Sequence, residues 1–101
     1  MTPEGKVKAK VKKILGDYHI YSFWPVQTGY GTHTLDCLGC YKELFFAIET
    51  KAAGKKPTVR QYQVIDEILD AGGVVFVIDG TPGSYDGLKT WLEAGIKDDG
   101  N

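Results

Sequence analysis

One stretch, residues 34–51, constrains the fold of this chain more than any other part of the sequence. It contains two β-prone runs, residues 34–40 and 44–51, which are joined by the short polar connection 41–43. Two such runs with a short polar connection between them are typical of a β-hairpin. We therefore expect an antiparallel pair of strands in the middle of the chain.

The second run of this hairpin ends in charged side chains. Residues 44–48 are all apolar, as in a buried strand, but Glu49 and Lys51 follow directly. Residues two apart on a strand point to the same face, so these two side chains project together. Asp36 lies on the other run, and the hairpin can bring it opposite them. Two carboxylates and an amine at the end of a sheet are costly unless something binds there, which makes this a candidate site.

The N-terminal residues predict an amphipathic helix over residues 2–15. Thr2 can cap it, and Pro3 fits its first turn. Glu4 precedes Val7, the first apolar residue of the helix, by three positions and therefore lies on the apolar face. Glu4 either belongs to the candidate site or is a first-turn acid favoured by the helix dipole. The apolar stripe consists of Val7, Val11, Ile14 and Leu15.

Basic residues are concentrated in the first part of the chain. Residues 1–60 carry 10 basic and 5 acidic groups, whereas residues 61–101 carry 2 basic and 8 acidic groups. One basic and one acidic face suit a protein that binds a polyanion such as nucleic acid on one side. Scattered solvated lysines are the alternative interpretation. The candidate phosphate contacts are Lys6, Lys10 and Lys13 on one stripe of the first helix, with Lys55 and Lys56 in an exposed loop.

The remaining segments predict further strands and helices. Residues 18–24 are aromatic and β-prone, and a loop over residues 25–33, containing Gly29 and Gly31, follows them. Residues 74–78 are a continuous apolar run, which predicts a strand buried on both faces. A short helix over about 85–94 packs Leu88, Trp91 and Leu92, and the tail from residue 97 onward is expected to fray.

A second full helix is expected to begin at Thr58 and to end near Gly72. The Thr58-x-x-Gln61 spacing is that of a capping box. Gln61 also lies four residues before Ile65 and can face inward on the apolar side of the helix. The spacing leaves a capping role and a role in the candidate site both open.

The order of these elements is αβββαβ plus a terminal helix, within one domain of 101 residues whose core spans about 2–79. The strand, helix, strand unit at its end implies a mixed central sheet. No apolar run approaches the ~20 residues of a membrane span, and no signal peptide is visible. With only two cysteines, we expect a cytoplasmic protein that has no membrane partner.

Five residues are candidates for one site at the edge of the sheet: Glu4, Asp36, Glu49, Lys51 and Gln61. Carboxylates without nitrogen or sulfur ligands suit a hard cation such as Mg²⁺ or Mn²⁺. The main-chain carbonyl of Thr50 can add a further ligand. A metal at such a site can polarise a phosphodiester and activate a bound water, which Lys51 can orient.

This pattern resembles the PD-(D/E)xK nuclease superfamily, and more narrowly its VRR-NUC family. The matching residues are a glutamate in the first helix, Glu4, then Asp36, the Glu49-x-Lys51 pair, and Gln61 opening the next helix. The resemblance covers residues 4 to about 79. It implies a restriction-endonuclease-like fold and makes these five residues catalytic, with Glu4, Asp36, Glu49 and the Thr50 carbonyl as metal ligands.

Residues 48–61 are similar to small stand-alone members of that family from bacteriophages. The resemblance therefore implies a Mg²⁺-dependent DNA endonuclease in the host cytoplasm, a four-way (Holliday) junction resolvase acting as a homodimer and leaving a 5′-phosphate. The chain departs from the family at His33-Thr-Leu-Asp36, where members usually have Gly-x-Pro-Asp. A non-catalytic nucleic-acid-binding module with the same fold is the alternative.

The two cysteines offer a different chemistry. Cys37-x-x-Cys40, with His33 and His19, can be read as a zinc site or a redox pair. Structural zinc needs four ligands in a tetrahedron, and redox pairs usually open a helix. Cysteines three apart on a strand point to opposite faces, which disfavours both readings. His33 can also serve as a proton donor near Asp36, although a loop histidine is more often only solvated.

The aromatic run 18–24 also bears on assembly. Its Tyr21 and Phe23 lie on the face opposite that of Tyr18, Ile20 and Trp24. A monomer of this size can cover one of these faces with helices, and the other is left as an apolar patch. We therefore expect a homodimer formed through this strand and the hairpin. The alternative is that the C-terminal helix covers the second face within one chain.

Overall fold

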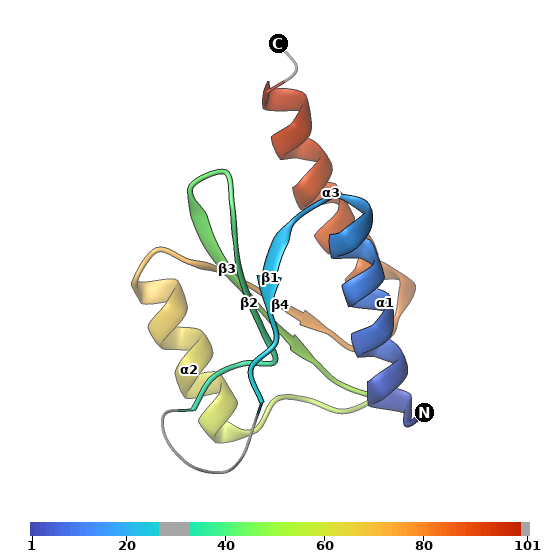
Figure 1. The fold of residues 1–101 in the computed structure, drawn as a ribbon. Helices are drawn as coiled ribbons and strands as arrows, with labels where there is room; N and C mark the ends of the chain where they lie inside the picture. The colour runs from blue at the N-terminus through green and yellow to red at the C-terminus, as the bar shows by residue number, and fades with distance from the viewer. Residues whose placement is uncertain (27–32, 100–101) are drawn as a thin grey trace.

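A computed structural model describes residues 1–26 and 33–99, so the glycines of the expected loop, Gly29 and Gly31, lie outside the described residues. Its described part is an α/β domain with a mixed sheet, as expected (Figure 1). The helices and strands are α1 (Pro3–Asp17), β1 (Tyr21–Phe23), β2 (Cys37–Tyr41), β3 (Leu44–Thr50), α2 (Val59–Asp70), β4 (Val74–Ile78) and α3 (Pro82–Asp99).

The four strands form one sheet in the order β1-β2-β3-β4. β1 and β2 pair antiparallel, β2 and β3 form the predicted hairpin, and β3 and β4 pair parallel across α2. β4 is therefore an edge strand of this sheet. The prediction that it is buried on both faces is wrong, because four of its five residues are only half-buried or exposed. An apolar run does not by itself distinguish a central strand from an edge strand.

Helices cover the two faces of the sheet unequally (Figure 1). On one face, α1 and α3 enclose the larger core together with Phe46 and Ile48 of β3. On the other face, α2 packs Ile65 against Ala47 of β3 and Leu35. β3 is thus covered on both sides over its second half, and its last five residues are buried.

The hairpin turn is tighter than predicted. Tyr41 pairs with Leu44 at the end of the ladder, so only Lys42 and Glu43 form the connection. Both have positive φ angles, 52° and 69°, as two-residue hairpin loops require. Tyr41 stays in the strand because its ring packs against Trp91, 5.3 Å between centroids, and its hydroxyl donates to the Leu92 carbonyl at 2.6 Å.

β1 is shorter than the aromatic run that predicted it. α1 continues to Asp17, and the backbone N–H of Tyr18 donates to the Ile14 carbonyl. His19 then adopts a φ of 57°, which turns the chain toward the sheet. Tyr18 and Ile20 therefore serve as packing residues of the larger core rather than as strand residues.

The C-terminal helix is longer than the expected 85–94. It begins at Pro82, after Asp79 has accepted hydrogen bonds from the N–H and hydroxyl of Thr81 at 3.1 and 2.7 Å. Glycines lower the helix propensity of this segment, but burial of Leu88 and Leu92 against α1 and β3 outweighs that preference. The expected fraying is wrong for residues 97–99, which are helical, and residues 100–101 lie outside the described part.

α3 packs on the same face of the sheet as α1. Trp91 contacts the rings of Phe46 and Phe76 on that face, with centroids 5.7 and 5.3 Å away. The alternative in which this helix covers Tyr21 and Phe23 is therefore wrong. Within the described residues, no helix is both long enough and apolar enough to cross a membrane.

Candidate functional site

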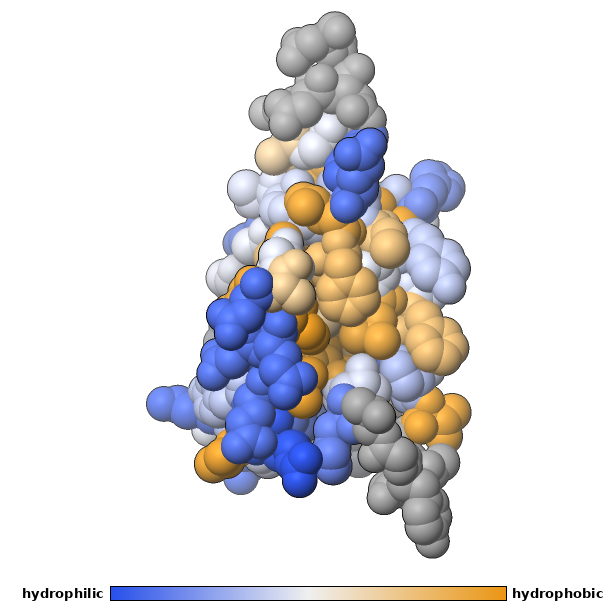
Figure 2. Space-filling model, turned by 90° about the vertical axis from the view of Figure 1, so that its left-hand side faces the viewer, coloured by the Kyte–Doolittle hydropathy of each residue, from blue (hydrophilic) through white to orange (hydrophobic). Residues whose placement is uncertain are grey.

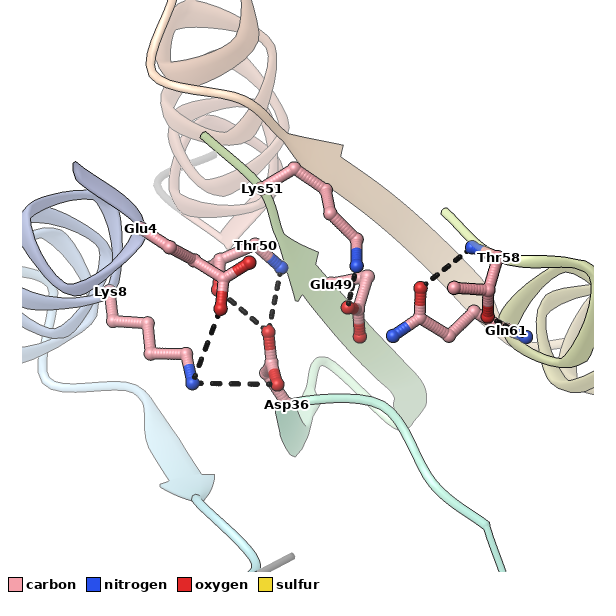
Figure 3. Close-up of polar contacts among 8 residues, drawn as sticks. All are labelled: Glu4, Lys8, Asp36, Glu49, Thr50, Lys51, Thr58 and Gln61. Atoms are coloured by element: carbon pink, nitrogen blue, oxygen red, sulfur yellow. Dashed lines mark hydrogen bonds and ion pairs between the residues drawn. The ribbon is translucent and has the colours of Figure 1, made fainter. Parts of the chain in front are cut away.

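The candidate site lies where β3 ends, between the first turns of α1 and the start of α2 (Figure 3). Glu49 and Lys51 project together from this strand end, as predicted. The Lys51 Nζ lies 3.2 Å from the Glu49 Oε2, and the Glu49 side chain is only 3% exposed. β3 places this carboxylate in the interior because it runs between β2 and β4 and beneath α2.

Asp36 is held rigidly against the end of β3. It immediately precedes β2, and its Oδ2 accepts hydrogen bonds from the Thr50 N–H at 2.9 Å and the Thr50 hydroxyl at 2.6 Å. Two bonds from one residue fix the orientation of the carboxylate. The backbone N–H of Thr50 was available because the β2–β3 ladder ends at Cys37 and Ile48.

Thr50 contributes more to the site than the sequence indicated. Its hydroxyl is a second donor to Asp36, although only its main-chain carbonyl was predicted to take part. On a strand, the N–H and C=O of one residue point toward the same neighbour. Since the N–H points to Asp36, the carbonyl is expected to face the Asp36 side as well.

Burial makes the Glu49 side chain a weaker acid than an exposed glutamic acid. Desolvation raises its pKa from 4.5 to about 7, and the nearby negative charge of Asp36 adds to the effect. The hydrogen bond and the positive charge of Lys51 oppose this rise without cancelling it. A bound cation would favour the ionised form and so lower this pKa.

Glu4 reaches this cluster through a lysine rather than directly. Its carboxylate is 42% exposed and lies 3.9 Å from the Lys8 Nζ, which in turn lies 3.7 Å from the Asp36 Oδ1 (Figure 3). Lys8 was not predicted as a site residue, although it follows Glu4 by four positions on the same helix face. In the described part of the chain, no group of three or more His, Cys, Asp and Glu side chains is placed to hold a metal ion.

Gln61 forms the capping box that its spacing predicted. Its Oε1 accepts the Thr58 N–H at 2.9 Å, and its own N–H donates to the Thr58 hydroxyl at 3.2 Å, which completes the capping box. Figure 3 shows its amide nitrogen on the side that faces Glu49. The cap therefore fixes the Gln61 side chain while its donor end stays directed at the site.

A hollow of about 290 Å³ opens beside these residues, and Asp36, Glu49 and Gln61 all contribute to its wall. His33 and Arg60 line the same hollow, and both are exposed. Arg60 was not predicted, because its position depends on how α2 approaches the sheet. A hollow lined by two carboxylates and an arginine has the groups that could hold a metal ion together with an anionic group.

The predicted phosphate-binding lysines are all exposed, but two have partners within α1 or beside it. Lys13 forms an ion pair of 2.8 Å with Asp17, and the Lys10 Nζ lies 4.3 Å from the centroid of the Tyr85 ring. Both contacts lie at the surface and can be exchanged for a phosphate at little cost. Lys6, Lys55 and Lys56 are also on the surface.

The cysteines do not form a metal or redox pair. Both are free; Cys37 is buried in the larger core, whereas Cys40 is exposed on the other face. Burial raises the pKa of the Cys37 thiol to about 12, so the thiolate that a metal or a redox reaction needs is strongly disfavoured. The two cysteines lie on opposite faces of the sheet, as expected for residues three apart on a strand.

The chain matches no model of a known protein family and no curated protein, and its structure matches no solved structure.

Proposed function

We propose that this chain is a metal-dependent deoxyribonuclease of the VRR-NUC family, with the restriction-endonuclease-like fold of the PD-(D/E)xK superfamily. The observation that carries this proposal is the Glu49 carboxylate, almost completely buried beside Asp36 and Lys51 at the end of β3. Such an arrangement destabilises the folded protein unless a cation balances it. Carboxylates with strongly perturbed pKa values in a hollow are typical of functional sites.

The donor set fits Mg²⁺ or Mn²⁺. Asp36 and Glu49 would hold the ion with carboxylate oxygens, and the Thr50 carbonyl would add a main-chain oxygen. Glu4 would join them once Lys8 has moved from between Glu4 and Asp36. When bound, the ion supplies a Lewis acid for the phosphodiester and lowers the pKa of a coordinated water.

The chain's own residues support hydrolysis of a phosphodiester in three ways. Thr50 fixes the Asp36 carboxylate, so this ligand needs little reorganisation. The Lys51 ammonium lies 3.2 Å from Glu49 and would donate a hydrogen bond to an attacking water or to a phosphate oxygen. Gln61 presents an amide donor from the start of α2, where its cap holds it.

DNA is the substrate that the charge distribution favours. The basic side chains of α1 and of residues 55 and 56 lie on the surface, where they can contact flanking phosphates without reading sequence. The family resemblance adds a preference for branched DNA such as a four-way junction. The products would carry a 5′-phosphate.

A panel of DNA structures tests this proposal. The purified chain with Mg²⁺ is incubated with four-way junction, flap, duplex and single-stranded DNA, alongside Glu49→Gln and Lys51→Ala proteins. We expect cleavage of at least one substrate by the wild-type protein and none by either variant, with DNA binding largely retained in both. Wild-type cleavage rates in a variant would remove that residue from the site.

One observation favours a second candidate, a nucleic-acid-binding module without catalysis. Lys8 already lies between Glu4 and Asp36, so its ammonium partly balances the charge that a metal ion would otherwise balance. This candidate predicts salt-dependent DNA binding with no cleavage under any divalent cation. The same panel, with binding and cleavage measured in parallel, separates the two candidates.

A further inference from the structure

The two carboxylate oxygens of Asp36 have different partners. The Oδ2 accepts both hydrogen bonds from Thr50, at 2.9 and 2.6 Å. The Oδ1 takes part in neither of these bonds and lies 3.7 Å from the Lys8 Nζ. The oxygen of Asp36 that is best placed to bind a metal ion is therefore the one that the Lys8 ammonium faces.

The same ammonium also faces Glu4. The Lys8 Nζ lies 3.9 Å from the Glu4 Oε2, so it sits between two of the predicted metal ligands (Figure 3). A divalent cation that binds both carboxylates would take these two oxygens, and its charge would repel an ammonium in this position. Lys8 and a bound metal ion therefore compete for the same two carboxylates.

The two lysines of the site are held differently. The Lys51 Nζ lies 3.2 Å from Glu49, and the Lys51 side chain is only 13% exposed. The Lys8 Nζ is farther from both of its partners than the roughly 3.2 Å of an ordinary hydrogen bond, and its side chain is 37% exposed. Ion pairs of this kind contribute little to stability and are readily exchanged. Lys8 is therefore the lysine that can leave the site when a metal ion enters.

An ammonium that leaves the site needs another anion, and bound DNA supplies one. Lys8 belongs to α1, the helix that also carries three of the predicted phosphate contacts. Figure 2 shows the side of the molecule on which α2 lies, and its middle is hydrophobic, so phosphates find few partners there. A DNA strand whose phosphate binds at the end of β3 would instead run beside the first turns of α1, where Lys8 can contact its backbone.

We propose that Lys8 is a built-in counter-ion of the metal-free site, which competes with the divalent cation and passes to a DNA phosphate when the cation binds. The exchange couples the two ligands, so metal ion and DNA strengthen each other's binding by the same factor. The inference rests on the proposed metal site. It concerns binding rather than cleavage, so it can be tested without turnover.

Titration with Mn²⁺ in the absence of DNA, followed by the electron paramagnetic resonance signal of the free ion, measures the competition. Lys8→Met should bind Mn²⁺ roughly three- to tenfold more tightly than wild type, because two exposed ion pairs no longer have to be broken. Lys8→Arg keeps the charge and should bind as wild type does. Lys12→Met is the matched control, because Lys12 lies one turn further along α1 with its Nζ over the Trp24 ring, and it should change the affinity much less. Asp36→Asn identifies the site, since it should weaken this binding.

DNA affinity, measured by fluorescence anisotropy in EDTA and in Ca²⁺, tests the transfer of Lys8 to DNA. Ca²⁺ is used because it also binds carboxylate and carbonyl oxygens. The gain in DNA affinity from EDTA to Ca²⁺ should be smaller for Lys8→Met than for wild type, by a similar factor of roughly three to ten. Lys12→Met should show the wild-type gain.

The outcomes separate this inference from the proposed function. If Lys8→Met binds Mn²⁺ no more tightly than wild type while Asp36→Asn binds it more weakly, the inference is overturned and the metal site stands. Equal tightening in Lys8→Arg would also overturn it, because the charge would not be the cause. An undiminished gain with Ca²⁺ in Lys8→Met would overturn the transfer to DNA. A wild-type protein that binds no Mn²⁺ would refute the proposed function and this inference together.

Discussion

Replacing Glu49 by glutamine is expected to stabilise the metal-free protein at neutral and alkaline pH. Burial and the charge of Asp36 raise the Glu49 pKa from 4.5 to about 7. Between these two values the folded state binds more protons than the unfolded state. The contribution of Glu49 to the free energy of unfolding is therefore fully present below the lower value and is lost as the pH rises through the upper one.

The size of this loss follows from the shift in pKa. A rise of about 2.5 units corresponds to about 3 kcal/mol between the two ends of the window. Glutamine has no charge to desolvate, and it can still accept a hydrogen bond from Lys51. It gives up the attraction between Glu49 and Lys51, so we expect a net gain of about 1–2 kcal/mol at pH 8.

Thermal unfolding in the presence of EDTA measures this effect. For a domain of this size, about 1 kcal/mol corresponds to roughly 4–8 °C in Tm. The difference in Tm between Glu49→Gln and wild type should grow from pH 5 to pH 8. Glu67→Gln, which removes an exposed carboxylate of α2, serves as the control and should show no such growth. A Glu49→Gln protein whose Tm follows the wild-type pH dependence would refute the reasoning.

Three further variants test the roles of other residues. Glu4→Gln should lower the cleavage rate clearly, but less than substitution of Asp36 or Glu49. If Glu4 only interacts with the helix dipole, Tm will change by the equivalent of about 0.3–1 kcal/mol and the cleavage rate will not change. Charge reversal at Lys6, Lys10 and Lys13 together should weaken binding to all DNA sequences and reduce its salt dependence, and an unchanged salt slope would place the DNA elsewhere. Thr50→Val should reduce cleavage at least tenfold, whereas Thr50→Ser keeps the hydroxyl and should retain the rate; equal loss in both would show that the bond to Asp36 is not what matters.

The pairing of site residues was predictable where it depends on local geometry. The period of two along a strand places Glu49 beside Lys51, and the hairpin brings Asp36 to the end of β3. The capping box at Gln61 likewise follows from spacing alone. These features depend on residues that are close in sequence or joined by a tight turn.

Features that depend on tertiary packing were not predictable in the same way. Lys8 reaches Asp36 only because α1 packs across the end of β3. The length of α3 depends on burial of Leu88 and Leu92, which outweighs the glycines of that segment. The edge position of β4 depends on strand order, and an apolar run carries no information about strand order.

The nicking of supercoiled plasmid is the most direct test of the central claim, that the carboxylates at the end of β3 form a metal-dependent nuclease site. Wild-type and Asp36→Asn proteins are compared side by side in Mg²⁺, in Mn²⁺ and in EDTA. The account predicts nicked plasmid for the wild-type protein with either metal, none in EDTA, and none for Asp36→Asn in any condition. Nicking that persists in EDTA, or that Asp36→Asn retains at the wild-type rate, would contradict it.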